Sequence, residues 1–405
     1  MKMLLLLLLW APNIFAVTDF IVDVNCPGED YNTIALAEDA TDINLTATTT
    51  VVFTGSKTGA VGDLATVTQY RGGSATGVSA TVAHANTNQI LLYGVSAGAG
   101  YVVGDEWRVD ASNYFTYASG VDSARVCINV HSDEGALTEF FSVAGGTVNA
   151  TNYRCITVPV GDRHSGTAYT GAQLKVNGGI ISVLEAYAVI EYLAVPQAVF
   201  DNLSAAYVFT MSGAFSTIRN CVIGNVSNPT SNNGGIRLNI ASAIAHNNII
   251  FNLDGAGVLF AVSFSDAGIR NCTVTDATVG FSKGGTFTTF SATNCLALDC
   301  TTCFSGITVT TCGSSDLTGS TGLTGLSSAN EFVSVALGSE DLHLKLGATS
   351  IDAGTDLGAD YITDIDGDTR TGAWDLGADE YMAPAASDNY SGKGLGRGIG
   401  RGIHR

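Results

Sequence analysis

Proline, charge and long apolar runs are all scarce in this chain of 405 residues, and each scarcity excludes a class of protein. Six prolines and a charged fraction of 14% do not fit a disordered or proline-rich linker protein, which stays unfolded through high charge and low hydrophobicity. Because 18 basic residues oppose 37 acidic ones, the net charge of −19 makes the body a poor partner for nucleic acid and anionic membranes. No apolar run reaches the roughly 18 residues of a transmembrane segment.

Long runs at helical spacing are missing as well. The apolar runs hold three to five residues, rich in Val, Ile, Phe and Thr, and Gly, Asn, Asp and Ser separate them. Such runs predict short strands joined by turns. With 48 glycines and 46% hydrophobic residues, the composition indicates an ordered protein rich in strands and turns.

Between residues 215 and 304 one pattern occurs four times, with an Asn placed just before β-forming residues. Successive copies of this Asn are 27, 24 and 23 residues apart. The four asparagines are Asn220, Asn247, Asn271 and Asn294. A period of this size, built from short strands, predicts the coils of a parallel β-solenoid. The alternative is a β-sandwich with coincidental spacing.

Equivalent residues of neighbouring coils stack about 4.8 Å apart. We therefore expect the four asparagines to form a structural ladder in which each side-chain amide bonds the next. A Cys follows the Asn in three of the four copies, and it is expected to stack as a small buried hydrophobe.

Six regions are expected along the chain. Lys2, the apolar run from Leu4 to Trp10 and Ile14–Ala16 are typical of a secretion signal, although a buried strand or a virion tail segment remains the alternative. The tail after residue 390 holds four regularly spaced cations; it lies on the acidic body, docks on an anionic partner or is a disordered end. The regions are a signal peptide (1–16), an N-terminal cap with the first strands (17–55), an inserted small β unit (56–112), a parallel β-helix (113–340), a closing module (341–383) and a flexible Gly/Arg tail (384–405).

Nine cysteines leave at least one free thiol. Cys300 and Cys303 have metal or redox spacing, but no second pair or His cluster accompanies them. A local disulfide among Cys295, Cys300, Cys303 and Cys312 is the second possibility. Stacked core thiols are the favoured interpretation.

The segment from Asp341 to Tyr381 carries the most specific motifs. It contains Asp341-Leu342-His343-Leu344, Ile351-Asp352-Ala353-Gly354, Asp364 to Arg370 and Trp374 to Tyr381. It resembles the C-terminal module of choice-of-anchor surface proteins, which are right-handed parallel β-helix proteins of the pectin-lyase-like group. Residues 348–350 depart from that pattern, since Ala-Thr-Ser stands where the family has Ser-Pro-Ala.

A weaker resemblance, with Gly161 to Thr167 as its landmark, is to phage tailspike-like β-helix proteins. Together the resemblances imply an all-β protein, a right-handed parallel β-helix with an N-terminal cap and a small inserted β unit. They imply a secreted or cell-surface location, or a virion, with a polysaccharide or cell-surface glycan as partner and a homotrimer as a plausible assembly. No transmembrane segment is expected.

Enzymes that resemble this fold act on polysaccharides. Lyases of the group use clustered carboxylates for Ca²⁺ and an Arg or Lys as base, and hydrolases use two or three carboxylates. The weak catalytic candidates are Arg219, Arg270, Asp254 and Asp276. Because no repeat carries paired acids, a non-catalytic structural or glycan-contacting role is favoured over a polysaccharide lyase or glycoside hydrolase.

One segment has the alternating carboxylates that suit calcium. Asp364, Asp366 and Asp368 lie on a predicted turn, and carboxylate oxygens are the ligands that Ca²⁺ prefers. The spacing does not fit an EF-hand, because Gly367 stands fourth rather than sixth. The alternative is a tight turn in which the carboxylates accept backbone N–H groups and Arg370 pairs with one of them.

Overall fold

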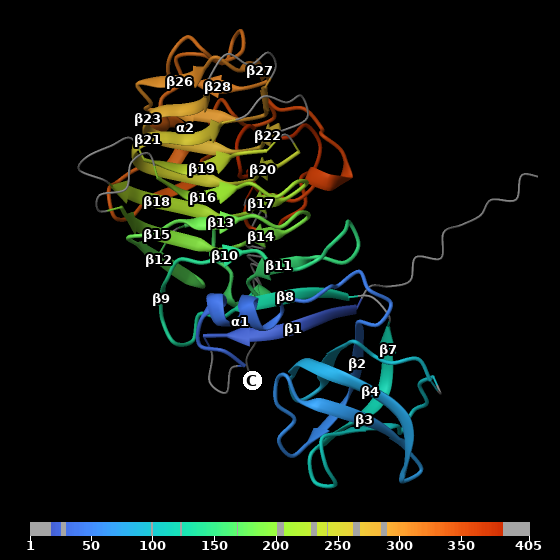
Figure 1. Ribbon diagram of the computed structural model, residues 1–405. Coiled ribbons are helices and arrows are strands. Elements are labelled where there is room, and N and C mark those ends of the chain that lie inside the picture. Colours follow the sequence, from blue (N-terminus) through green and yellow to red (C-terminus); the bar gives the residue numbers. More distant parts are fainter. Residues whose placement is uncertain are drawn as a thin grey trace, which may run out of the picture.

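The computed structural model describes residues 18–25, 30–98, 100–121, 124–167, 169–200, 206–227, 233–240, 242–261, 268–284 and 290–383. The predicted signal peptide (1–16) and the Gly/Arg tail (384–405) lie outside these residues. Nine short strands stack in parallel into one sheet, called face A here (Figure 1). In spatial order they are β1 (Thr18–Val24), β8 (Ala124–Val130), β11 (Arg154–Thr157), β14 (Val189–Glu191), β17 (Thr217–Arg219), β20 (Ile244–His246), β22 (Gly268–Arg270), β24 (Ser291–Thr293) and β27 (Thr308–Thr310).

A second sheet of 13 strands supplies the two other faces of each coil. Face B is built from β9 (Leu137–Thr138), β12 (Gln173–Asn177), β15 (Ala194–Val199), β18 (Val222–Ser227), β25 (Leu296–Leu298) and β28 (Gly313–Ser314). Face C is built from β10 (Ser142–Val143), β13 (Ile181–Val183), β16 (Tyr207–Met211), β19 (Gly234–Leu238) and β26 (Thr302–Ser305). The long strands β21 (Ile249–Phe260) and β23 (Thr273–Lys283) belong to both faces, because each pairs with a face B strand and then a face C strand.

The chain therefore runs from face A to face B to face C and returns to face A one coil further on. Every strand pair within these two sheets is parallel, from the pairing of β1 with β8 to that of β24 with β27. The prediction of an all-β parallel β-helix is confirmed by this topology.

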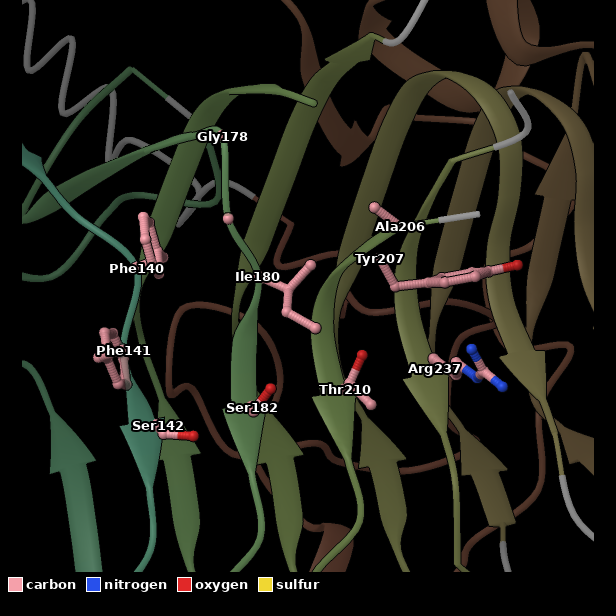
Figure 2. A pocket seen from close by; sticks show the side chains of 11 residues that line it. Phe140, Phe141, Ser142, Gly178, Ile180, Ser182, Ala206, Tyr207, Thr210 and Arg237 are labelled. Atoms are coloured by element: carbon pink, nitrogen blue, oxygen red, sulfur yellow. The ribbon is translucent and has the colours of Figure 1, made fainter. Parts of the chain in front are cut away.

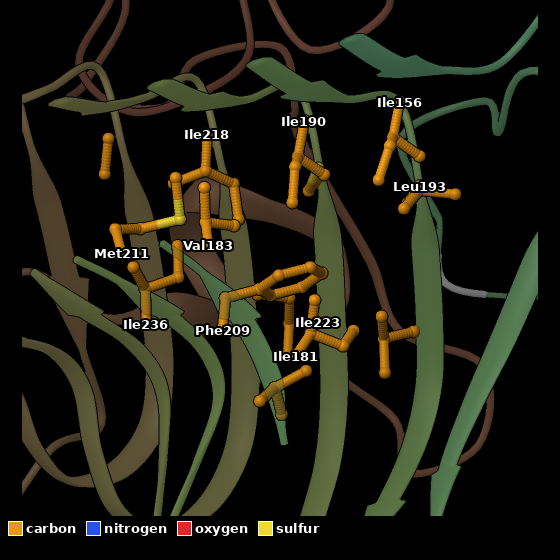
Figure 3. Packing of buried hydrophobic residues seen from close by; sticks show 14 of the residues in the cluster. Ile156, Ile181, Val183, Ile190, Leu193, Phe209, Met211, Ile218, Ile223 and Ile236 are labelled. Carbon is orange, nitrogen blue, oxygen red and sulfur yellow. The ribbon is translucent and has the colours of Figure 1, made fainter. Parts of the chain in front are cut away.

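Aliphatic side chains from the three faces fill the interior of the coils (Figure 3). Because successive strand residues point to opposite sides, one residue in two faces inward and forms a continuous row down the solenoid. Each fully buried Ile contributes roughly 1.5–3 kcal/mol by leaving water. One such row on face A consists of Val22, Ile128, Ile156, Ile190 and Ile218.

The inserted unit is a closed antiparallel barrel, seen below β1 in Figure 1. Its own core surrounds Phe53, Trp107 and Phe115. The barrel is wider than the predicted range of 56–112, because the strands that close it begin at Val51 and end at Val121. Its strands are β2 (Val51–Thr58), β3 (Thr66–Arg71), β4 (Ser74–Ala85), β5 (Gln89–Tyr93), β6 (Glu106–Arg108) and β7 (Tyr114–Val121).

The cap has two parts. Helix α1 (Ile34–Ala40) covers the end of the solenoid core, and the Thr33 hydroxyl caps it by accepting the N–H of Leu36. The free edge of β1 is covered by the barrel, since Asn86 and Gln89 hydrogen-bond its backbone groups. This arrangement protects an otherwise unpaired sheet edge.

The C-terminal module, residues 328–383, lies along the flank of the solenoid instead of closing its end (Figure 1). It begins with α2 (Ser328–Glu331), and β29 (Phe332–Ser334) pairs with β30 (Asp341–Leu344). It also includes the 3₁₀ turn η2 (Ala359–Tyr361), whereas η1 (Val160–Asp162) lies in an earlier coil. Its apolar residues pack on face B, where Val222, Ile249, Phe251, Leu296 and Leu298 form the solenoid side of the contact.

The cysteines of the repeats are free and buried, as Cys221, Cys272, Cys295 and Cys312 show. Cys300 and Cys303 are free as well, so the described structure contains stacked thiols at this end rather than a local disulfide. A disulfide that the sequence analysis did not anticipate joins Cys127 and Cys155 on adjacent face A strands.

Candidate functional site

The repeated asparagines mark the corner between face A and face B. Six residues at this corner, one from each of six consecutive coils, have a left-handed backbone with φ between 47° and 62°. Asn tolerates this conformation better than most residues because its short side chain bonds locally. The six are Tyr192, Asn220, Asn247, Asn271, Asn294 and Thr311.

The Asn side chains do not bond one another as the ladder hypothesis expected. The amides of Asn220, Asn247 and Asn294 instead donate to backbone carbonyls of Asp364, Thr363 and Thr355 in the C-terminal module. Asn271 is buried, and its amide has no hydrogen-bond partner within the described part of the chain. The corner row is therefore the attachment line of the C-terminal module.

Arg219 and Arg270 occupy equivalent positions on face A two coils apart, with His246 between them. Arg219 pairs with Glu191 at 2.6 Å. Burial and the two flanking guanidinium groups lower the pKa of His246 to about 3, so this imidazole is neutral. Tyr361 of the C-terminal module covers the row, since its ring lies 5.0 Å from both the His246 ring and the Arg270 guanidinium.

The other two catalytic candidates lie elsewhere. Asp254 and Asp276 are exposed on β21 and β23, beyond the corner from face A. The C-terminal module packs over that corner, so the four predicted residues do not share one site. The arginines and the aspartates lie on different faces of the coil, because Arg270 precedes the corner at Asn271, whereas Asp276 follows it by five residues.

Asp276 does line a small cavity on face B. Its neighbour on the next coil is Asp299, because Thr275 pairs with Leu298. Glu340 of the C-terminal module lines the same cavity of about 280 Å³. Asp299 accepts the Ser328 hydroxyl, and Glu340 accepts the Tyr169 hydroxyl at 2.9 Å.

The carboxylates of Asp364 and Asp366, two of the three predicted calcium ligands, have different partners. Asp364 is buried, and its carboxylate accepts the N–H groups of Asp366 and Asp368 at 3.0 and 2.8 Å. Burial and nearby carboxylates raise its pKa to about 7. Asp366 bonds His343 at 3.0 Å. Arg370 pairs with Glu380 rather than with any of the three aspartates.

An open groove on face C has a volume of about 700 Å³ (Figure 2). Its floor carries a row of polar side chains from four consecutive strands, at positions that the strand register aligns. Side chains beside each of them point inward, which is the alternation of a half-buried strand. The row consists of Ser142, Ser182, Thr210 and Arg237.

Aromatic rings stand at two walls of this groove. Phe140 is 55% exposed, and a Cβ on Gly179 would lie 2.2 Å from its ring. A Cβ on Gly234 would likewise lie 2.1 Å from the Tyr207 ring. The two glycines thus let the rings lie against bare backbone. A groove with aromatic walls and a few aligned polar groups has the composition of a ligand site.

Sequence reasoning missed this groove. The positions 182, 210 and 237 are separated by 28 and 27 residues, which is one coil length, so the repeat contained the signal. The aromatic walls had no such signal, because Phe140 and Tyr207 belong to different coils and do not recur at equivalent positions.

Comparisons with known proteins assign no family to this chain. No family model matches the chain, and no curated protein matches its sequence. A structure described as pectate lyase Pel9A is similar over 64% of this chain and 88% of its own, with 12% identity and a TM-score of 0.26. Since the identity and the TM-score are this low, its activity is not transferred to this chain. No helix in the described residues has the length and apolar character to span a membrane.

Proposed function

We propose that this chain is an exported, non-catalytic β-helix protein that contacts glycans through the groove on face C. The observation that carries the proposal is the polar row of Ser142, Ser182, Thr210 and Arg237 between the rings of Phe140 and Tyr207. Hydroxyl and guanidinium groups match sugar hydroxyls, and the exposed ring of Phe140 suits the apolar face of a sugar, whereas Tyr207 is buried and shapes the opposite wall. The groove runs across the strands, so a chain of sugars would meet one polar residue per coil.

Location at a bacterial cell surface or on a virion is part of the same proposal, as is a homotrimer. Support for export comes from the Cys127–Cys155 disulfide, because disulfides persist in oxidising compartments. The N-terminal apolar run is in keeping with a secretion signal. The C-terminal motifs shared with surface β-helix proteins agree with either location.

Binding to a panel of neutral and acidic polysaccharides tests the proposal. Phe140→Ala removes an exposed ring and is expected to weaken binding by about fivefold, in line with an aromatic contact of about 1 kcal/mol. Arg237→Gln should weaken the binding of acidic glycans more than that of neutral ones. Phe215→Ala is the matched control, because Phe215 is 56% exposed and stacks on Tyr187 outside the groove. Equal losses in the Phe140 and Phe215 variants would contradict the assignment.

A polysaccharide lyase or glycoside hydrolase is the second candidate, and the cavity of Asp276, Asp299 and Glu340 favours the hydrolase. Neighbouring parallel strands lie about 4.8 Å apart, and glycosidase carboxylates are about 5–9.5 Å apart. We rank this candidate lower because the cavity is smaller than the face C groove and two of its carboxylates accept hydroxyl groups of the protein.

Assays of released reducing ends and unsaturated uronates on the same panel decide between the two. Activity that disappears in Asp276→Asn and Asp299→Asn but persists in Asp254→Asn would replace the binding proposal. Asp254 is the control because it is exposed on the adjacent strand β21 and does not line the cavity. Glycan binding without product release supports the non-catalytic role.

A further inference from the structure

Within the described residues, two clusters of three His, Asp or Glu side chains are close enough to hold a metal ion. The clusters differ in whether the protein places a guanidinium among the carboxylates. In the first, Glu38, Asp42 and Glu185 meet around the guanidinium of Arg154, which is 1% exposed. The protein therefore supplies a permanent cation to that cluster. In the second, His343, Asp366 and Asp379 each offer one atom, and these atoms lie within 4.8 Å of one another.

The second cluster has no guanidinium of its own. Of the two guanidinium groups nearby, Arg370 is engaged by Glu380 at 3.2 Å and by the carbonyls of Gly377 and Ala378 at 3.0 and 2.8 Å. Arg163, beside Gly367, donates to the Val158 carbonyl and lies over the Tyr192 ring. Two carboxylates at the centre, and a third on Asp341 behind the imidazole, thus face a single histidine ring. These three carboxylates carry more negative charge than one protonated imidazole can neutralise.

The orientation of His343 is fixed from behind. Its Nδ1 bonds the Asp341 carboxylate at 2.5 Å, which directs Nε2 toward Asp366. A carboxylate on the remote nitrogen is the usual support of a metal-ligating imidazole. Asp379 is fixed in the same way, because one of its oxygens accepts the N–H of Leu344 at 2.6 Å.

The imidazole of His343 packs against the backbone of residue 166. Residue 166 is a glycine, and a Cβ at this position would lie 2.1 Å from Nε2 of His343. Any other residue would displace the imidazole from the position in which it faces the carboxylates. Gly166 has a positive φ of 68°, which also favours glycine, so the backbone and the packing agree.

We propose that His343, Asp366 and Asp379 bind a divalent transition-metal ion of the zinc class. Zinc accepts imidazole and carboxylate at about 2.0–2.2 Å in a tetrahedron, so its ligand atoms are roughly 3.3 Å apart. The Nε2 to Asp366 distance of 3.0 Å is already close to this value. Calcium fits poorly, because it takes six to eight oxygen ligands. The ion would join β30 to the turn at 364–368 and to residue 379.

The full-length protein, treated with a chelator and then dialysed, tests the site by calorimetry and thermal unfolding with ZnCl₂ and CaCl₂. Zinc is expected to bind one to one and to raise the melting temperature by several degrees, whereas calcium has little effect. His343→Gln and Asp366→Asn should each weaken zinc binding by about 10-fold or more. Asp366 has a side chain that is 30% exposed, so its variant keeps the buried contacts of the module.

His131→Gln is the matched control. His131 also lies between two aspartates, Asp23 at 3.1 Å and Asp162 at 2.9 Å, but it belongs to neither three-ligand cluster of the described residues. This variant should bind zinc as the parent protein does. Gly166→Ala should lose zinc binding although no ligand is changed.

Three outcomes would overturn the proposal. Zinc binding that persists in both ligand variants would place the ion elsewhere. If calcium binds and raises the melting temperature as much as zinc does, the site would instead be the calcium site predicted at Asp364, Asp366 and Asp368. Absence of one-to-one zinc binding in the parent protein would show that His343 serves as a paired imidazolium only. If His343→Gln does not fold, Co²⁺ is added to the parent protein and to Asp366→Asn instead. An absorption spectrum of bound Co²⁺ in the parent protein that is lost in Asp366→Asn supports the site, and a spectrum unchanged in the variant contradicts it.

Discussion

The N-terminal regions (α1 and the barrel) and the C-terminal module both cover the solenoid, but their attachments differ. The N-terminal regions combine apolar contacts of Ile34, Val52 and Leu91 with ion pairs, namely the Arg154 cluster behind α1 and the contacts of His84 at the barrel. The C-terminal module is attached through an apolar cluster on face B and the amides of the corner row.

This difference follows from whether each part has a core of its own. The barrel has its own core around Phe53, Trp107 and Phe115, and only a few of its apolar residues, Val52, Ala83 and Leu91, join the solenoid core. The C-terminal module shares its apolar cluster with the solenoid and has no comparable core within the described residues. A region with its own core shares few apolar residues with the solenoid, whereas a region without one depends on the solenoid for its core.

The largest effect is expected at Arg154. Arg154→Met leaves Glu38 and Glu185 buried without their cation, which costs about 3–5 kcal/mol of unfolding free energy. Urea unfolding of the parent and the variant measures the loss. Arg125→Met is the control, because its ion pair with Asp19 is about one-third exposed and is worth no more than about 1 kcal/mol. Equal losses would show that the burial of the first cluster does not matter.

A smaller effect is expected at the corner row. Asn247→Leu loses the bond to the Thr363 carbonyl and places a branched side chain at φ 52°, which together cost about 2–4 kcal/mol. Asn247→Gly keeps the backbone conformation and loses only the amide, so it should cost less. Hydrogen exchange should locate the loss in the C-terminal module. A variant with unchanged unfolding would refute the attachment line.

The smallest effect is a pH dependence at the barrel. Burial lowers the pKa of His84, but the hydrogen bonds to Asp30 and Asp63 outweigh it and raise the pKa to about 9. The protonated ring therefore stabilises the folded state fully below pH about 6.5, and this contribution is lost as the pH rises through 9.

We expect a loss on the order of 2 kcal/mol between pH 6.5 and 9.5, which His84→Gln should not show. Unfolding of both proteins across this range gives the difference. Salt should weaken the same contact and leave the apolar attachment of the C-terminal module unaffected. A pH dependence that remains in His84→Gln would assign the titration to another group.

The coil register was predictable because Asn at a left-handed corner recurs with the period of the coil. The role of these asparagines was not, because their partners Thr355, Thr363 and Asp364 lie 61 to 144 residues away. The barrel boundaries were missed for a related reason. Val51 to Thr54 has the pattern of any half-buried strand, and only its pairing with β5 and β7 assigns it to the barrel.

The sequence identified individual candidate residues, but it did not show which of them lie together in one site. Arg219 and Arg270 precede the corner at the same position, so their common face could be read from the repeat. Asp254 and Asp276 lie on the other side of the corner, and the sequence did not show where the corner would separate them from the arginines. The polar row on face C recurs at one coil length and could be read from the repeat, but the aromatic walls of the groove and the His343 cluster have no periodic signal.

The pairing of β2 with β7 has a further consequence for the order of folding. Strand β1 has to find β8, which begins 100 residues after the end of β1, and a flexible loop of that length slows closure. The first and last barrel strands are neighbours, with Val52 opposite Val121, so a folded barrel brings its two ends together. Once the barrel has formed, the first two coils are connected as if by a short linker. The inserted barrel therefore slows the pairing of β1 with β8 only slightly.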